Sequence, residues 1–357
     1  MQRNQSKTSG ERVRGSEDLN GLLSNRAPRA GSENGPKKIV TIGGGTGTFV
    51  VLSGLRKKGG AELSAIVSSA DDGGSTGRLR DAYGSLPVGD ARQALIALSA
   101  DGTVLRDLFA FRFEKGDIAG HNLGNLFLTA LTEILGNEAK AIREASRILR
   151  VSGYVIPATE RSTTLVATLE DGTQVRGEHA IDIRDGARAK IRDMRLDEDA
   201  PLSEQARVAI REASLIVLGP GDLYASTVAA LLPKGMKEAI AESPARLVYV
   251  MNLFTKKGQT NGYAASDFIQ EIERYAGRAP DVILMNTDTF PKEVVEFYAA
   301  HDECPLADDL PRDDARVRRL PLASVHELAK LREGDDVPRS LVRHDPGRLA
   351  DALDGIA

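Results

Sequence analysis

A glycine-rich run follows the first apolar segment of the sequence and is the strongest sign of chemistry in it. The run Gly43-Gly44-Gly45-Thr46-Gly47-Thr48 lies between the β-branched segment Lys38–Ile42 and a helical apolar pattern that begins at Phe49. Glycines let the backbone approach a phosphate closely, and a helix N-terminus supplies free N–H groups and partial positive charge. The run therefore predicts a phosphate site, although a tight turn without a ligand stays open.

The spacing of these glycines separates the site from two common nucleotide loops. A dinucleotide fingerprint needs a third glycine three residues after the second, but that position is Thr48 or Val50, depending on where the count begins. A P-loop ends in Lys-Ser or Lys-Thr, and no such pair follows Gly47. The run is therefore not predicted to bind NAD or ATP in either of these ways.

A second polar stretch follows the next apolar segment. Asp71 and Asp72 stand directly after it, and Ser75 and Arg78 come a few residues later. Two carboxylates at a strand end can hold a divalent ion such as Mg²⁺, accept hydrogen bonds from a ribose, or cap a helix. The Arg78 side chain can face a phosphate or lie in solvent on a helix.

Further polar residues recur beside later apolar segments. His121, Asn122 and Asn125 precede an apolar helical pattern, where they can contact a ligand or, as is common for Asn, cap the helix. A second glycine turn contains Gly219 and Gly221 and follows Leu215–Leu218. A third polar strand end contains Asn252 and Thr255. No spacing resembles a Ser/His/Asp triad or a histidine metal site, and Cys304, the single cysteine, lies in an acidic stretch that disfavours a thiolate.

These stretches follow elements that alternate between strand and helix. Apolar segments of strand type are expected at 38–42, 63–67, 215–218, 246–251 and 281–285, and helices at 91–99, 125–135, 138–150 and 203–213. Such alternation predicts an α/β fold with a doubly wound, mainly parallel sheet of Rossmann-like type. Ligands bind beyond the carboxyl ends of the strands in such a sheet, which is where the glycines and polar residues are expected.

The composition limits the remaining possibilities. A net charge of −4, with Lys and Arg dispersed among Asp and Glu, gives no general attraction to nucleic acid. No apolar run reaches the roughly 18–20 residues of a membrane span, and the N-terminus lacks the apolar segment of a secretory signal. We therefore expect a cytoplasmic protein with no nucleic-acid partner and no membrane span.

The sequence predicts two parts of different character. Residues 1–36 are rich in Ser, Gly, Asn, Arg and Glu and are expected to form a disordered tail. Residues 37–357 are expected to form a single α/β domain with a β-hairpin insertion near 160–185, since Asp171-Gly172 separates two segments of strand type, 163–169 and 174–183. The charged stretch 302–320 is expected to be a surface loop.

Taken in order, these stretches resemble one protein family. The resemblance covers roughly residue 37 to the C-terminus. It depends on Gly43–Gly47, Ala70–Arg80, Gly89-Asp90-Ala91-Arg92, Gly120–Leu126, Ile156–Thr159, Gly219–Tyr224 and Arg343-His344-Asp345-Pro346. The chain is similar to the bacterial gluconeogenesis factors that bind uridine diphosphate-N-acetylglucosamine (UDP-GlcNAc), which are relatives of the 2-phospho-L-lactate transferases.

The resemblance implies a ligand, a role and further site residues. It implies a nucleotide-sugar ligand bound without a required cofactor, and a role in carbon metabolism and cell-shape maintenance. It places Thr46, Asp71 and Asp72 near the ligand, and identifies Tyr298 and Arg343 with a tyrosine and an arginine that contact the nucleotide sugar. The family's Gly-Pro-Gly-Ser pattern is altered at Asp222, so that helix capping or metal binding is expected there in place of phosphate contact. We also expect a homo-oligomer.

Three functions are compatible with these residues. The first is a UDP-GlcNAc-binding regulator that catalyses no reaction. The second is a transferase of the 2-phospho-L-lactate type, in which Asp71 or Asp72 holds Mg²⁺ against a diphosphate. The third, a dinucleotide-binding dehydrogenase, is disfavoured by the missing third glycine.

Overall fold

The computed structural model describes residues 35–325 and 341–356, apart from residues 71, 73, 84–87, 101 and 185–188. The chain divides into two units, Met1–Gly35 and Pro36–Ala357. The tail predicted at residues 1–36 lies outside the described residues, except for its last two.

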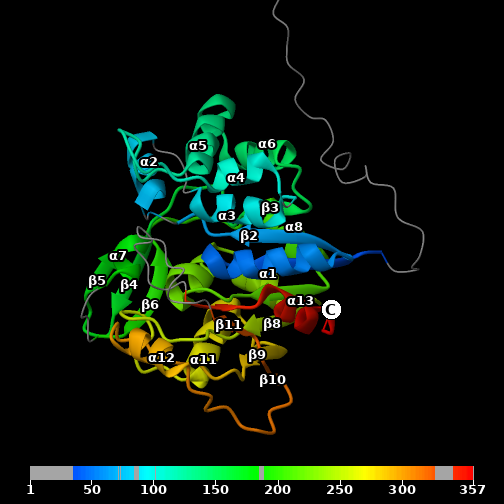
Figure 1. The fold of residues 1–357 in the computed structure, drawn as a ribbon, viewed down its shortest axis with the longest axis vertical. Coiled ribbons are helices and arrows are strands. Elements are labelled where there is room, and N and C mark those ends of the chain that lie inside the picture. Colours follow the sequence, from blue (N-terminus) through cyan, green and yellow to red (C-terminus); the bar gives the residue numbers. More distant parts are fainter. Residues whose placement is uncertain are drawn as a thin grey trace, which may run out of the picture. The chain divides into compact units, whose positions relative to one another are not determined.

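A seven-stranded parallel sheet forms the centre of the described residues (Figure 1). The strand order is β10-β9-β8-β7-β1-β2-β3, and β1 pairs with β2 on one side and with β7 on the other. The strands are β1 (Lys37–Ile42), β2 (Ala61–Val67), β3 (Tyr154–Pro157), β7 (Leu215–Leu218), β8 (Arg246–Val250), β9 (Val282–Asn286) and β10 (Val317–Leu320). The order reverses between β1 and β7, and this confirms the predicted doubly wound α/β sheet.

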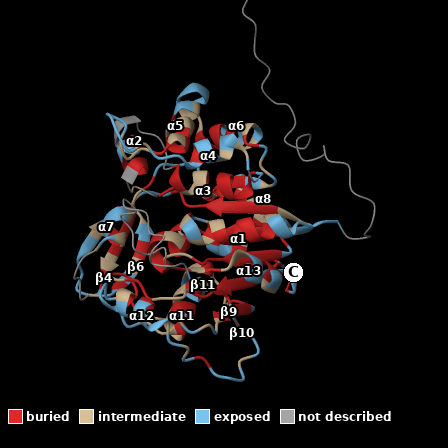
Figure 2. Ribbon diagram, viewed as in Figure 1, coloured by how far each residue is buried: buried red, intermediate tan, exposed pale blue. Residues whose placement is uncertain are grey.

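Helices cover both faces of this sheet because alternate strand residues point to opposite faces. One apolar cluster contains Ile39 and Val217 together with side chains from α1 (Gly45–Lys58), α3 (Gly89–Leu98), α4 (Val104–Ala110), α5 (Leu123–Leu135), α6 (Glu138–Ile148) and α13 (Pro346–Asp354). The other contains Val40 and Ile216 with side chains from α8 (Glu204–Glu212), the π-helix η2 (Leu223–Val228), α9 (Ala229–Leu231), α10 (Met236–Glu242) and α11 (Ala265–Ala276). Figure 2 shows the strands of the sheet buried between these layers.

The insertion after β3 is larger than the predicted hairpin. Strands β4 (Leu165–Leu169) and β5 (Gln174–Arg176) form the expected antiparallel pair, and β6 (Ile191–Leu196) adds a third strand on the other side of β4. The second half of the predicted strand 174–183 is wrong, because Glu178–Asp182 forms the short helix α7. Gly177 begins this helix with a φ of 96°, a conformation that ends the strand and that glycine adopts readily.

The C-terminal elements also differ from the predicted loop at 302–320. Its last residues form β10, the edge strand that pairs with β9, so the stretch is not loop throughout. Helix α12 (Lys292–Ala299) precedes it, and β11 (Ala323–Val325) pairs antiparallel with β12 (Val342–His344) before the chain enters α13. Helix α2 (Gly74–Tyr83) follows β2 and contacts α5.

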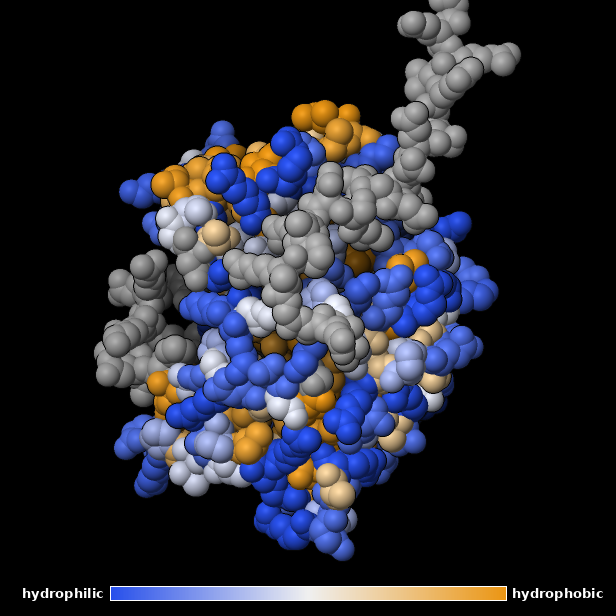
Figure 3. Space-filling view, turned by 90° about the vertical axis from the view of Figure 1, so that its right-hand side faces the viewer, coloured by the Kyte–Doolittle hydropathy of each residue, from blue (hydrophilic) through white to orange (hydrophobic). Residues whose placement is uncertain are grey.

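The face drawn in Figure 3 is mainly polar and includes a conspicuous apolar area. Figure 3 shows hydrophobic residues at the top of the molecule, where Figure 1 places α5. The large exposed apolar side chains of α4 and α5 are those of Val104, Leu105, Leu108, Ile134 and Leu135. Among the helices that the structure describes, none is both long and apolar enough to cross a membrane.

Candidate ligand-binding site

The glycine run at the end of β1 turns directly into α1. Gly43 and Gly45 have φ values of 149° and 65°, which are conformations that L side chains rarely adopt. Thr46 lies exposed in the first turn of the helix. Thr48 is buried instead, and its Oγ1 donates a hydrogen bond to the Gly44 carbonyl at 3.2 Å. Of the two threonines, therefore, only Thr46 offers its hydroxyl to solvent or to a ligand.

Two other segments lie against this turn and leave no room for side chains. A Cβ on Gly47 would lie 1.8 Å from the Pro220 carbonyl oxygen, and one on Gly44 would lie 2.0 Å from Asp90 Oδ2. The Gly45 N–H also donates to Asp90 Oδ1 at 2.7 Å. Asp90 belongs to the Gly89–Arg92 motif but was not among the predicted site residues. Its carboxylate accepts a hydrogen bond from one of the backbone N–H groups that have no partner within α1. The N–H groups that follow Gly45 in the first turn of the helix are left for a ligand.

The second glycine turn is held beside the first because β7 pairs with β1. Gly219 has a φ of 68°, and the Gly219–Pro220 peptide is cis. The Gly221 carbonyl accepts a hydrogen bond from Asn252 Nδ2 at 2.7 Å, and Asn252 Oδ1 accepts one from the Tyr249 hydroxyl at 3.1 Å. The predicted residues Gly219, Gly221 and Asn252 thus lie together at the carboxyl edge of the sheet, next to the β1 turn.

Asp222 has a partner that the sequence did not reveal. Lys256, whose side chain is 6% exposed, forms ion pairs with Asp222 Oδ2 at 2.7 Å and with Asp182 of α7. Gln259 donates to Asp182 Oδ1 at 3.1 Å and accepts from the Ala225 N–H at 3.2 Å. Asp222 precedes η2 without a side-chain capping bond. The expectation that it caps a helix is therefore wrong, and the lysine compensates its charge.

Asp72 also contacts the insertion. Its Oδ1 accepts a hydrogen bond from the His179 N–H at 2.6 Å, so that the carboxylate caps the N-terminus of α7. Asp71 lies outside the described residues. Within the described part of the chain, no group of three or more His, Cys, Asp or Glu side chains is arranged to hold a metal. The Mg²⁺ site at Asp71 and Asp72 stays a prediction, and capping is what the structure shows for Asp72.

Ser75 and His121 lie side by side at the start of α2. Ser75 Oγ is 3.1 Å from His121 Nδ1 and accepts a hydrogen bond from the Asn122 N–H at 3.3 Å. Burial, followed by the positive charges of Arg78 and Arg112, lowers the pKa of His121 and favours its neutral form. This serine–histidine contact was not predicted. The Ser75 hydroxyl is buried and already accepts a hydrogen bond from Asn122. It is therefore not exposed to a substrate in the way that a nucleophile must be.

The neighbouring asparagines have structural partners. Asn122 caps α5 by accepting from the Gly124 N–H at 2.9 Å. Asn125 donates to Thr76 and accepts from Arg92 Nε at 2.8 Å. Arg92 is on α3, two residues after Asp90, so this cluster adjoins the β1 turn through α3. The capping interpretation of Asn122 is confirmed, and the predicted ligand contacts of these residues stay predictions.

Arg78 turns to the loop that carries His121. Both terminal nitrogens of its guanidinium lie 3.4 Å from the Ala119 carbonyl oxygen, and the side chain remains exposed. The loop therefore holds Arg78 at the rim of the serine–histidine cluster, where contact with a phosphate stays a prediction.

Tyr298 of α12 contacts β12, the strand that carries Arg343, although the two elements are distant in sequence. The buried Tyr298 hydroxyl accepts from the Val342 N–H at 3.4 Å, and its ring stacks on Phe254 with centroids 4.2 Å apart. For the Arg343 guanidinium, no hydrogen bond or ion pair with the described residues is found. Thr255 is buried, and its Oγ1 accepts from the Cys304 N–H at 2.9 Å, so its hydroxyl is used within the protein.

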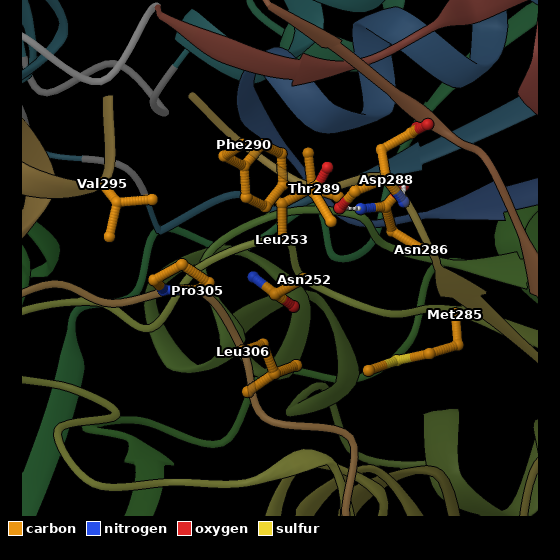
Figure 4. Close-up of a pocket in the computed structure, with 10 residues that line it drawn as sticks. All are labelled: Asn252, Leu253, Met285, Asn286, Asp288, Thr289, Phe290, Val295, Pro305 and Leu306. Carbon is orange, nitrogen blue, oxygen red and sulfur yellow. Dashed lines mark hydrogen bonds between the residues drawn. The ribbon is translucent and has the colours of Figure 1, made fainter. Parts of the chain in front are cut away.

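A hollow of about 280 Å³ opens beyond the carboxyl ends of β8 and β9 (Figure 4). Residues from the two strand ends and the loops behind them line it: Asn252, Leu253, Met285, Asn286, Asp288, Thr289, Phe290, Val295, Pro305 and Leu306. In Figure 4 the Asn252 side chain lies in the middle of this group. The Asp288 carboxylate points away and accepts from the Ala323 N–H at 2.7 Å.

Of this lining, only Asn252 was predicted as a site residue. The sequence did contain a signal for Asn286 as a site residue, because it directly follows a predicted strand, as Asn252 does. Phe290 lies in a loop with no periodicity, and nothing in the sequence alone marked it.

The fold is that of an α/β protein whose two glycine turns meet at the reversal point of a doubly wound sheet. A profile of the family described as 2-phospho-L-lactate transferase CofD matches residues 39–325, and the chain belongs to this family.

Its relatives include proteins named as gluconeogenesis factors. The chain is 39% identical over 320 residues to a putative gluconeogenesis factor of Thermotoga maritima, covering 90% of this chain and 99% of the relative. It is 38% identical over 318 residues to the gluconeogenesis factor of Bacillus subtilis, covering 88% and 96%. A crystal structure of a Bacillus halodurans protein superposes with a TM-score of 0.81 at 38% identity, covering 89% of this chain and 99% of that one.

Proposed function

We propose that this protein binds UDP-GlcNAc across the reversal point of its sheet and acts in the cytoplasm as a regulator of carbon metabolism and cell shape. The proposal depends on the close contact between the two glycine turns. Gly47 and Pro220 lie against each other beside the first turn of α1. That turn presents N–H groups and the exposed Thr46 hydroxyl to an anion. The naming of the relatives as gluconeogenesis factors supports the metabolic role.

Arg343 supplies the positive charge that a diphosphate needs. Since its guanidinium has no partner among the described residues, it can form charge-assisted hydrogen bonds with a phosphate without first breaking an ion pair. Asp90 offsets part of the positive end of α1, so that phosphate binding depends more strongly on this arginine.

Calorimetry with UDP-GlcNAc tests the proposal. Wild-type protein should bind the ligand equally well with Mg²⁺ and with a chelator, and no product should form. Thr46→Ala and Arg343→Ala should each weaken binding about 10-fold or more, because a hydrogen bond to a charged group contributes about 1.5–3 kcal/mol. Arg318→Ala is the matched control, since Arg318 is exposed on β10. Full-strength binding by both site variants would show that the ligand lies elsewhere.

The second candidate function is an Mg²⁺-dependent transferase acting on a nucleoside diphosphate substrate. The observation that favours it is the Asp90 carboxylate beside the Gly43–Gly47 turn. An acidic group beside a diphosphate is commonly bridged to it by Mg²⁺. A strict Mg²⁺ requirement together with release of a nucleoside phosphate would favour this function over the regulator.

A further inference from the structure

The hollow beyond β8 and β9 has the size of part of a ligand. Its volume of about 280 Å³ lies just below the range of about 300–1,000 Å³ typical of pockets that hold a whole small ligand. It also adjoins the second glycine turn directly, because Asn252 lines the hollow and donates to the Gly221 carbonyl. A ligand with its diphosphate on the glycine turns would therefore place one of its two ends here.

The lining favours a flat heterocycle over a sugar. Six of the ten lining residues are apolar: Leu253, Met285, Phe290, Val295, Pro305 and Leu306. A hexose would bring several hydroxyls against these side chains, and each buried hydroxyl without a partner costs free energy. A base buries two apolar faces, can stack on the Phe290 ring, and confines its polar atoms to its edge.

Asn252 is the polar group that can meet this edge. An Asn amide has two N–H donors and two acceptor lone pairs. One donor is used by the Gly221 carbonyl and one lone pair by the Tyr249 hydroxyl, so one donor and one acceptor remain. Because a carbonyl only accepts, the end of the amide that faces Gly221 must be the nitrogen. The remaining donor and acceptor therefore cannot exchange places by a flip of the side chain.

We propose that this hollow is a nucleobase subsite and that the fixed Asn252 amide selects uracil over cytosine. Uracil presents an N3–H donor beside a carbonyl acceptor, which complements the remaining acceptor and donor of Asn252. With the ribose held in one place, cytosine presents an acceptor at N3 and an amino donor beside it. The N3 acceptor of cytosine would then face the amide acceptor of Asn252, and its amino donor would face the amide donor. The inference depends on the proposed function, since it assigns one end of that ligand.

Ligand fragments and analogues test the subsite with the wild-type protein alone. By calorimetry, UMP should bind at least 10-fold more tightly than N-acetylglucosamine-1-phosphate, which carries the other end of the ligand. UDP should bind at least 10-fold more tightly than CDP and than UDP methylated at N3, because each analogue leaves a buried polar group unpaired. N-acetylglucosamine-1-phosphate binding as tightly as UMP would overturn the inference. Equal affinity for UDP, CDP and the methylated analogue would also overturn it.

Variants then assign the discrimination to a residue. Asn252→Ala should bind UDP, CDP and N3-methyl-UDP within about twofold of one another, whereas Phe290→Leu should weaken all three by a similar factor of about 5–10. Asn137→Ala is the matched control, since the Asn137 side chain also bonds the backbone, accepting from the Lys140 N–H, but does not line the hollow. Asn252→Ala retaining the preference of the wild type for UDP would overturn the role of Asn252. If the wild type binds UDP-GlcNAc without discriminating between bases, only the subsite proposal is refuted. If it binds no uridine nucleotide, both the subsite proposal and the proposed function are refuted.

Discussion

Replacing Lys256 by Met should destabilise the protein far more than an ordinary surface lysine substitution. The ammonium group is nearly inaccessible and pairs with Asp182 and Asp222, which come from the insertion and from the second glycine turn. Methionine keeps most of the length and apolar stem of the side chain but removes the ammonium group that pairs with both carboxylates. The free energy of unfolding should fall because these like charges repel and are partly desolvated.

The magnitude follows from the burial of the three partners. Removing one partner of a fully buried ion pair costs about 3–5 kcal/mol. The side chains of Asp182 and Asp222 remain 19% and 34% exposed, so water can screen part of the charge that Lys256 compensates in the wild type. Gln259 also continues to donate to Asp182. We therefore expect Lys256→Met to lower the free energy of unfolding by about 2–3 kcal/mol.

Urea unfolding followed by far-UV circular dichroism measures this loss, since the chain has no tryptophan to report on it. Lys234→Met is the matched control. Lys234 pairs with Asp199 at 3.2 Å, but both side chains are more than 70% exposed, so the change should be about 0.5 kcal/mol or less. In the Lys256→Met background, Asp222→Ser should restore about 1–2 kcal/mol. A loss at Lys256 no larger than that at Lys234 would refute the reasoning.

Three further changes test other parts of the structure. Burial raises the pKa of Glu138 to about 8, so the folded protein keeps a proton that the unfolded chain releases above pH 4.5. Stability should therefore fall from pH 4.5 to 8, and Glu138→Gln should add up to about 4 kcal/mol at pH 8 in urea titrations. Burial lowers the pKa of His344 to about 4, so stability should fall as the pH drops from 6.5 to 4, and His344→Gln should remove up to about 3 kcal/mol of that fall. Gly47→Ala should cost about 2–3 kcal/mol of stability and weaken the proposed UDP-GlcNAc binding, because its methyl group meets the Pro220 carbonyl. Gly355→Ala is the control and should change both little, because its methyl group meets only ordinary contacts.

The central fold could be predicted because its signals are local. The β-branched run before Gly43 and the apolar run before Gly219 each specify a strand, and the glycines after them specify the turns. The strand order then places these turns side by side. The edge strand β10 was missed because Val317–Leu320 carries two arginines and lacks the apolar run of a central strand. Helix α7 was missed because only five residues form it, too few to show a helical period.

The places of the candidate residues in the fold could be predicted better than their hydrogen-bond and ion-pair partners. Sequence reasoning identified the turns at Gly43–Gly47 and Gly219–Gly221 but could not show which polar groups are used within the protein. Asp72 looks like a metal ligand in sequence, and only the path of the insertion shows that it caps α7. Lys256 gave no signal because its carboxylate partners lie 34 and 74 residues away in the chain.

The pairing of β1 with β7 also has a consequence for synthesis on the ribosome. Ile39 is near the start of the described residues, but its partner Leu215 is made only after the helices and the insertion between them. Contacts between such distant segments form late, because the intervening chain must first be closed into a loop. The nascent N-terminal half therefore leaves one edge of β1 without a neighbour until β7 emerges. If the proposed function holds, nucleotide sugar in the cell would accordingly bind only chains that have been translated past the second glycine turn.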